Sequence, residues 1–168
     1  PEEALPVLEA ELALNRRYWS HDKNGILCAQ GNIANCLHNL GRRDEALVLR
    51  RAAYDGFVAL RGSSHETSIG EGMNLAVSMN SSRLWEESIP FMRDQLLPAA
   101  NRSVGVDHHI TLGIKQNLCL ALEFNPERTR DDLRLNKHVR RRRDSVLIST
   151  QATTCSKPRL LCMTWSRG

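Results

Sequence analysis

Three asparagines recur along the chain at almost equal spacing. Asn32 and Asn74 are 42 residues apart, and Asn117 follows Asn74 after 43 residues. A side-chain amide carries both a hydrogen-bond donor and an acceptor, so a series of such amides can pair with the backbone of an extended peptide of any sequence. The same amides could instead pair with neighbouring helix groups and hold adjacent structural units in register. The residues alone leave both interpretations open.

Two further asparagines extend the candidate surface. Asn35 and Asn39 follow Asn32 at steps of three and seven residues, so on a helix the three amides share one face. The predicted peptide-binding residues are therefore Asn32, Asn35, Asn39, Asn74 and Asn117. The full set of residues expected to face the same groove is Cys28, Gly31, Asn32, Asn35, His38, Asn39, Met73, Asn74, Val77, Asn80, Gln116, Asn117, Leu120 and Phe124.

The sequence has no arrangement of residues typical of a catalytic or metal site. It contains no phosphate-binding Gly-x-x-x-x-Gly-Lys loop, no Gly-x-Ser-x-Gly elbow and no His-Glu-x-x-His motif. His21, His65 and His108 recur between predicted helices, where a role in the loops is favoured over metal binding. The five cysteines form no Cys-x-x-Cys pair, as in a protein of a reduced compartment. We expect no enzyme, no metal and no cofactor.

The asparagine spacing belongs to a longer-range repeat. Glu3-Ala4-Leu5, Glu45-Ala46-Leu47 and Glu87-Ser88-Ile89 also lie 42 residues apart, and His65 and His108 each precede an asparagine by nine residues. A period of this length is typical of a solenoid. Apolar residues around both sets of marks recur at three- and four-residue steps, so each unit is predicted to be two helices. We expect antiparallel helices near 2–18, 26–40, 43–60, 68–81, 84–102, 111–124 and 129–147.

Turn and packing residues agree with this pattern. Gly41 stands where the first helix of a unit ends, a place that favours a left-handed backbone. Pro6 and Pro90 share a phase close to the predicted starts of second helices, where a proline costs little. Small residues allow the two helices of a unit to approach closely. They are Ala34, Ala76 and Cys119 on the first helices and Ala46 and Ser88 on the second helices.

The phased motifs resemble the tetratricopeptide repeats of the kinesin light chain type, whose units carry a pattern like His-Pro-x-Thr-Leu, Asn-Asn-Leu-Ala and Gly-x-Tyr-x-Glu-Ala. The matching segments are His65-Glu66-Thr67-Ser68-Ile69, Met73-Asn74-Leu75-Ala76, Trp85-Glu86-Glu87-Ser88, Gly31-Asn32-Ile33-Ala34, Gly41-Arg42-Arg43-Asp44-Glu45-Ala46, His108-His109-Ile110-Thr111-Leu112 and Gln116-Asn117-Leu118-Cys119. The resemblance covers roughly residues 2–139. The chain departs from the pattern in lacking the proline after each histidine, and in having Arg83 and Pro126 at turn positions.

The resemblance implies an all-α fold, a right-handed α-solenoid of antiparallel helix pairs in units of about 42 residues. It also implies that Asn32, Asn74 and Asn117 contact the backbone of a bound ligand. We expect a repeat array over 1–148, with a partial unit at 1–20 and units at 26–67, 68–110 and 111–148. A disordered basic tail is expected over 149–168. Because the chain starts within what looks like a second helix, it is expected to be a segment of a longer array.

Charge is distributed unevenly along the chain. Residues 134–168 contain nine Lys or Arg against one acidic residue, whereas the whole chain has a net charge of +4. The run Arg140-Arg141-Arg142-Arg143 could be a nucleic-acid or nuclear-localisation patch. The favoured interpretation is the solvated face of a helix, because no aromatic residues interleave with the arginines as a base-stacking surface requires. Nucleic acid is therefore not expected as a partner.

The sequence predicts a scaffold or adaptor module that binds an extended peptide or a partner protein on the concave face of the array. The alternative is a regulatory repeat region of a larger signalling or nucleotide-driven protein. No run of 18 apolar residues occurs, and 25% of the residues are charged, so no membrane contact is expected. The expected location is the cytoplasm.

Overall fold

The computed structural model describes residues 3–141, and this part of the chain is built of helices with no strand. The elements are α1 (Ala4–Tyr18), α2 (Lys23–Asn39), α3 (Arg43–Arg61), α4 (Glu66–Ser81), α5 (Trp85–Pro90), the π-helical segment η1 (Phe91–Leu96), α6 (Leu97–Ser103), α7 (His109–Phe124) and a further helix over 130–141. The predicted all-α fold and helix order are confirmed. The disordered tail expected over 149–168 lies outside the described residues.

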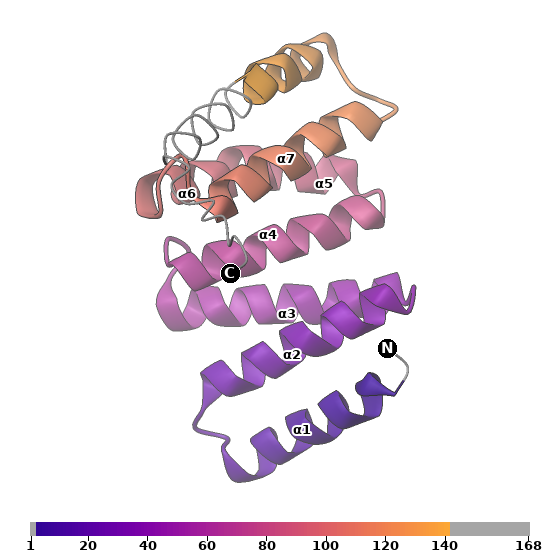
Figure 1. Cartoon of the computed structure of the whole chain (residues 1–168), viewed down its shortest axis with the longest axis vertical. Helices are drawn as coiled ribbons and strands as arrows, with labels where there is room; N and C mark the ends of the chain where they lie inside the picture. Colours follow the sequence, from indigo (N-terminus) through magenta and orange to yellow (C-terminus); the bar gives the residue numbers. More distant parts are fainter. Residues whose placement is uncertain (1–2, 142–168) are drawn as a thin grey trace, which may run out of the picture.

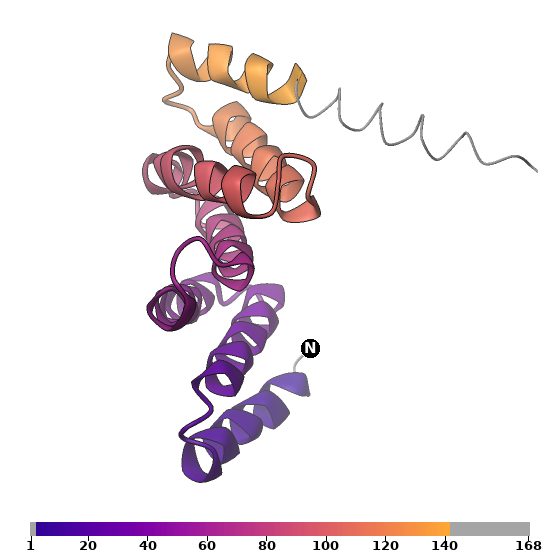
Figure 2. The same ribbon diagram turned by 90° about the vertical axis from the view of Figure 1, so that its left-hand side faces the viewer.

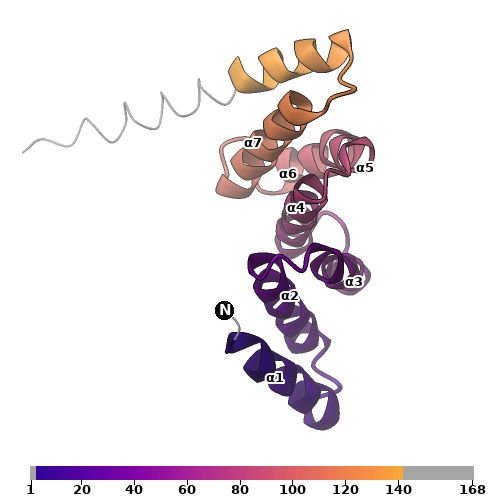
Figure 3. The same cartoon turned by 90° about the vertical axis from the view of Figure 1, so that its right-hand side faces the viewer.

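The helices stack into an elongated array. Figure 1 shows them following one another along the long axis, from α1 at one end to the helix over 130–141 at the other. The first helices of the units, α2, α4 and α7, lie on one side of the array, and α3, α5 and α6 lie on the other (Figures 2 and 3). Helices α1 to α4 pack mainly on their neighbours in the chain, and α7 packs on α4, α5 and α6. This nearest-neighbour packing is typical of solenoids.

Small side chains allow the helix pairs to approach as predicted. Ala34, Ala46 and Ala76 are completely buried, as is Ser88, and Cys119 is 2% exposed. The Ser88 hydroxyl donates to the Asn80 side-chain oxygen over 2.6 Å, which satisfies a polar group in the interface.

The phased histidines begin helices. The side chain of His65 accepts a hydrogen bond from the backbone N–H of Thr67 at the start of α4, and His108 accepts one from Ile110 at the start of α7. Asp22 caps α2 by accepting from the backbone of Gly25 over 2.9 Å. Each cap pairs a backbone donor that the helix itself leaves without a partner. The histidine marks of the repeat are thus explained by local structure.

The second helix of unit two is not a regular α-helix, although the sequence predicted one over 84–102. The chain is α-helical to Pro90, π-helical over Phe91–Leu96 and α-helical again from Leu97, with a second proline at Pro98. Proline has no backbone N–H and removes one α-helical hydrogen bond. Pro90 is the sixth residue of α5, beyond the first turn where the missing donor would cost nothing. The π-helical segment lies between these two interruptions.

The arginine run is described only in part. Arg140 and Arg141 are exposed on the last helix, Val139 is buried, and Arg140 pairs with Glu123 of α7. For these residues the interpretation as a solvated helix face agrees with the structure. Arg142 and Arg143 lie outside the described residues.

Candidate protein-interaction face

The exposed side of α2 is a stripe of polar residues. Cys28, Asn32, Asn35 and Asn39 are exposed at steps of four, three and four residues, which place them on one helix face. Gly31 was predicted to join this stripe but is buried: a Cβ at its position would lie 3.7 Å from the side chains of Arg50 and Glu71.

The stripes of α4 and α7 are more apolar. Met73, Asn74 and Val77 are half-buried on α4, while Leu120 and Phe124 on α7 are 41% and 64% exposed. The two helices are in close contact: the side-chain amide of Asn80 donates to the backbone carbonyl of Asn117 over 3.2 Å. We call the exposed sides of α2, α4 and α7 together the first-helix face. Its character changes from amides at α2 to apolar side chains at α7.

The structure divides the five predicted peptide-binding asparagines into two groups. Asn35 accepts a hydrogen bond from Arg50, and Asn117 donates to the carbonyl of Gly113 in its own helix over 2.9 Å. Asn32, Asn39 and Asn74 make no side-chain hydrogen bond within residues 3–141. Asn35 thus pairs with a neighbouring helix, whereas the bond of Asn117 stays within α7. Whether these amides or the other three contact a ligand stays a prediction.

Arg50 makes a buried polar contact beneath this face. Its side chain, only 4% exposed, lies 3.2 Å from a carboxylate oxygen of Glu71 on α4 and also donates to Asn35 on α2. Burial lowers the pKa of Arg50, and the neighbouring Glu71 carboxylate opposes that shift. The Nε atom of Arg50 is buried with no hydrogen-bond partner in the described part of the chain. Sequence reasoning missed this contact, although an arginine at a core phase of the repeat was a signal.

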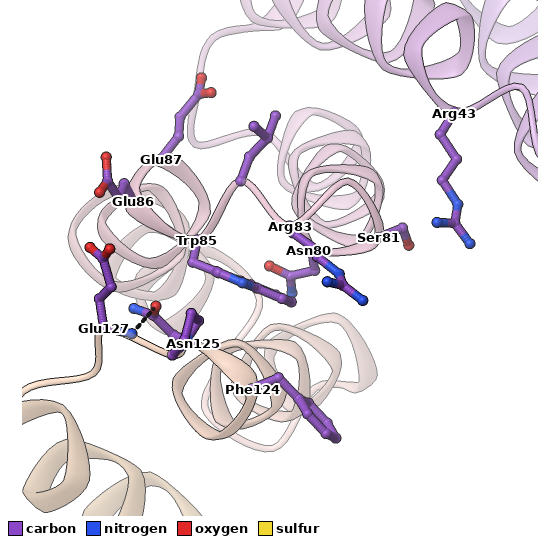
Figure 4. A pocket seen from close by; sticks show the side chains of 12 residues that line it. Arg43, Asn80, Ser81, Arg83, Trp85, Glu86, Glu87, Phe124, Asn125 and Glu127 are labelled. Atoms are coloured by element: carbon purple, nitrogen blue, oxygen red, sulfur yellow. Dashed lines mark hydrogen bonds between the residues drawn. The ribbon is translucent and has the colours of Figure 1, made fainter.

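A pocket of about 990 Å³ opens at the edge of the array beside the first-helix face (Figure 4). It is formed by the turn between α4 and α5, the start of α5, the end of α7 with its following turn, and Arg43 at the start of α3. We call it the edge pocket. Because three units contribute to it, no single motif of the sequence predicted it. Phe124 lines both the edge pocket and the first-helix face, so the two surfaces adjoin.

Charges of opposite sign lie on opposite sides of the edge pocket. In Figure 4 the carboxylates of Glu86 and Glu127 lie on one side, and the guanidinium groups of Arg43 and Arg83 on the other. None of these four makes an ion pair within residues 3–141. Glu87 differs, because it pairs with Arg51 of α3, and that hydrogen bond lowers the pKa of Glu87.

Two kinds of site are absent from the part of the chain that the structure describes. No group of three or more His, Cys, Asp or Glu side chains is placed to hold a metal ion between residues 3 and 141. Within the same residues, no helix has the length and apolar character needed to cross a membrane.

Comparison with known proteins identifies the fold. No protein-family model and no curated protein sequence matches the chain. Among solved structures, it is similar to the nearly identical TPR-like repeats of a Podosopora anserina protein assigned as a kinesin light chain, with a TM-score of 0.70 and 17% identity over 89% of this chain and 68% of that chain. A glutamine-to-methionine variant of that protein gives a TM-score of 0.72, also at 17% identity. The chain thus has the fold of the TPR-like repeats of kinesin light chain-like proteins.

Proposed function

We propose that the chain is a protein-interaction module that binds an extended segment of a partner protein across the first-helix face. The observation that carries this proposal is the set of amides at Asn32, Asn39 and Asn74, which make no side-chain hydrogen bond within residues 3–141; Asn32 and Asn39 are exposed and Asn74 is half-buried. An extended backbone offers one donor and one acceptor at almost every residue, which is the pattern that side-chain amides complement.

The apolar end of the face adds selectivity to this backbone pairing. Leu120 and Phe124 are exposed on α7, and Val77 is half-buried on α4, the helix that packs against α7. An apolar side chain of the partner that lies against them is removed from water, which contributes roughly 25 cal/mol per Å² of buried apolar surface. The proposed ligand is therefore an extended segment with apolar side chains at one end and any sequence at the other.

The proposed role needs no catalytic step and no cofactor. The proposed location is the cytoplasm, which rests on the cysteine usage of the sequence: five cysteines with no even framework. Proteins or peptides are the proposed partners.

The test uses Asn74→Ala, because Asn74 lies on the central first helix with units on both sides. Its amide makes no side-chain hydrogen bond in the described part of the chain, so its loss should leave the melting temperature almost unchanged. Loss of a pairing with the ligand backbone should weaken binding by roughly 1–2 kcal/mol, about 5- to 30-fold. Binding is measured by calorimetry with an extended peptide selected from a library.

Asn101→Ala is the matched control, because Asn101 is exposed on α6 on the opposite side of the array. It should change neither affinity nor melting temperature. If Asn74→Ala leaves affinity unchanged and lowers the melting temperature by several degrees, the asparagine series holds the units in register and the proposal is wrong.

A further inference from the structure

The edge pocket has a charge pattern that can complement itself. We define its basic rim as Arg43 and Arg83, its acidic rim as Glu86 and Glu127, and its apolar lining as Leu84, Trp85 and Phe124. We propose that a second copy of this chain docks here about a two-fold axis, so that the basic rim of each copy faces the acidic rim of the other.

The unpaired charges of the two rims favour a second copy of the chain as the partner. In a two-fold interface the same patch on both subunits meets itself, and every contact occurs twice. A patch with separate basic and acidic rims satisfies this condition. The two-fold rotation that relates the copies can place the basic rim of each copy against the acidic rim of the other. A partner that carries only one sign of charge would be repelled by one of the two rims. All four rim residues make no ion pair within the described chain, so their charges remain available.

The apolar lining supplies surface to bury. Phe124 is 64% exposed and Leu84 is 37% exposed, while Trp85 between the rims is half-buried. Interfaces are enriched in aromatic and arginine residues, and their strongest contacts cluster near the centre. Trp85 lies between the charged rims in this way (Figure 4).

The backbone at Arg83 is a third observation. Its φ of 59° lies in the left-handed region, which costs a side-chain-bearing residue roughly 1–2 kcal/mol. The equivalent turn of unit one has Gly41 at this position, which adopts the same region without that cost. Strained backbone conformations occur preferentially at functional sites. Arg83 makes no ion pair within residues 3–141, so its guanidinium remains available to a second copy.

The test is a charge exchange, followed by analytical ultracentrifugation of the full 168-residue chain. The unmodified chain should form dimers. Arg43→Glu with Arg83→Glu makes both rims acidic, and Glu86→Arg with Glu127→Arg makes both rims basic. Each double variant alone should dissociate at least about tenfold more readily than the unmodified chain. An equimolar mixture of the two should associate again, because an all-acidic patch then meets an all-basic one.

The matched control reverses two exposed arginines elsewhere, Arg16→Glu with Arg102→Glu, and should dimerise as the unmodified chain does. Phe124→Ser is a second probe that removes an exposed side chain from the apolar lining. It should also weaken the dimer at least about tenfold without lowering the melting temperature. Circular dichroism confirms that each variant is folded.

Three results would overturn the proposal. The first is an unmodified chain that stays monomeric up to about 1 mM, where even a weak dimer is visible. The second is dimerisation of both double variants at the strength of the control. The third is a mixture of the two double variants that remains monomeric while the unmodified chain dimerises, since this would place the dimer contact on another surface.

Discussion

At the scale of single residues, two turns of the array have the same backbone geometry with different amino acids. The backbone N–H groups of Gly41 and Arg42 donate to the carbonyls of His38 and Leu37, and the N–H groups of Arg83 and Leu84 donate to those of Asn80 and Met79. Both turns have the hydrogen bonds of a Schellman motif, which requires a left-handed residue. The sequence identified Arg83 as a departure from the repeat pattern, and the structure shows that the turn keeps its geometry despite it.

This comparison predicts that Arg83→Gly stabilises the fold. Glycine removes the strain of the left-handed backbone but also makes the unfolded chain more flexible, so the expected net gain is about 0.5–1 kcal/mol. Gly41→Ala is the matched control and should lose about 1 kcal/mol through its φ of 79° alone, because a Cβ there meets no atom within 4 Å. Urea unfolding of dilute samples measures both changes. A loss of stability in Arg83→Gly would show that the Arg83 side chain supports its own chain.

A second prediction at the scale of residues concerns Glu87 and the dependence of folding stability on pH. Its hydrogen bond with Arg51 lowers the pKa of Glu87 from the ordinary value of 4.5. A carboxyl with a lowered folded-state pKa stabilises the fold above its unfolded pKa, and this contribution is lost as pH falls through the folded pKa. Glu87→Gln should therefore reduce stability at pH 7 and show a smaller further loss below pH 4.5. Since the pair is half-exposed, the effect should be a few tenths of a kcal/mol.

Thermal melts at pH 7 and about pH 3 compare Glu87→Gln with Glu86→Gln, which removes an exposed carboxylate that has no ion pair in the described chain. An identical pH dependence in the two variants would contradict a role for the Arg51 pair.

At the scale of helices, the sequence predicted most of the fold because its repeated residues are those that the packing of neighbouring helices requires. The small residues Ala34, Ala46 and Ala76 must be buried for the helices to pair, and they are. The π-helical segment was not predicted, because the apolar period of a helix does not report its hydrogen-bond register. The internal role of Asn35 was not predicted either, because it depends on Arg50 of the next helix.

Arg50 occupies a core phase of the repeat. The residues 42 positions before and after it are Leu8 and Met92, both apolar. Removing one member of a buried ion pair leaves the other charge unpaired, whereas replacing both members by apolar residues can be neutral or stabilising. Arg50→Met alone should therefore destabilise the fold, by about 1–3 kcal/mol, because Glu71 is only partly exposed to water.

Adding Glu71→Leu to Arg50→Met should restore most of this loss. Denaturant unfolding of the two single variants and the double variant gives the coupling energy between Arg50 and Glu71. Additive losses in the double variant would show that the contact contributes no coupling and that Arg50 stabilises the core by packing alone.

At the scale of the whole molecule, most of the core of the described residues lies in two clusters of unequal size, and Ala34, Ala53 and Phe57 of α2 and α3 are buried outside both. The cluster on α1, α2 and α3 contains seven buried apolar residues, and the cluster on α4 to α7 and the last helix contains seventeen. The edge pocket also belongs to this scale: it forms where the turns of three units meet, and no window of sequence contains its pattern. The order of the helices was predictable from the repeat, but the surfaces between units depend on how far each unit rotates against the next.

The unequal clusters predict unequal protection of the backbone. In a solenoid each unit is stabilised by its own core and by its neighbours, so an end with a small core can open without the rest. The amides of α1 and α2 should therefore exchange hydrogen faster than those of α4 and α7, as measured by mass spectrometry on peptic peptides.

Arg50 lies where α2, α3 and α4 meet, and its polar contact interrupts the apolar packing there. Arg50→Met with Glu71→Leu should make this junction apolar and slow exchange in α2 more than in α7. Equal protection along the unmodified chain would show that the two clusters open together as one cooperative unit.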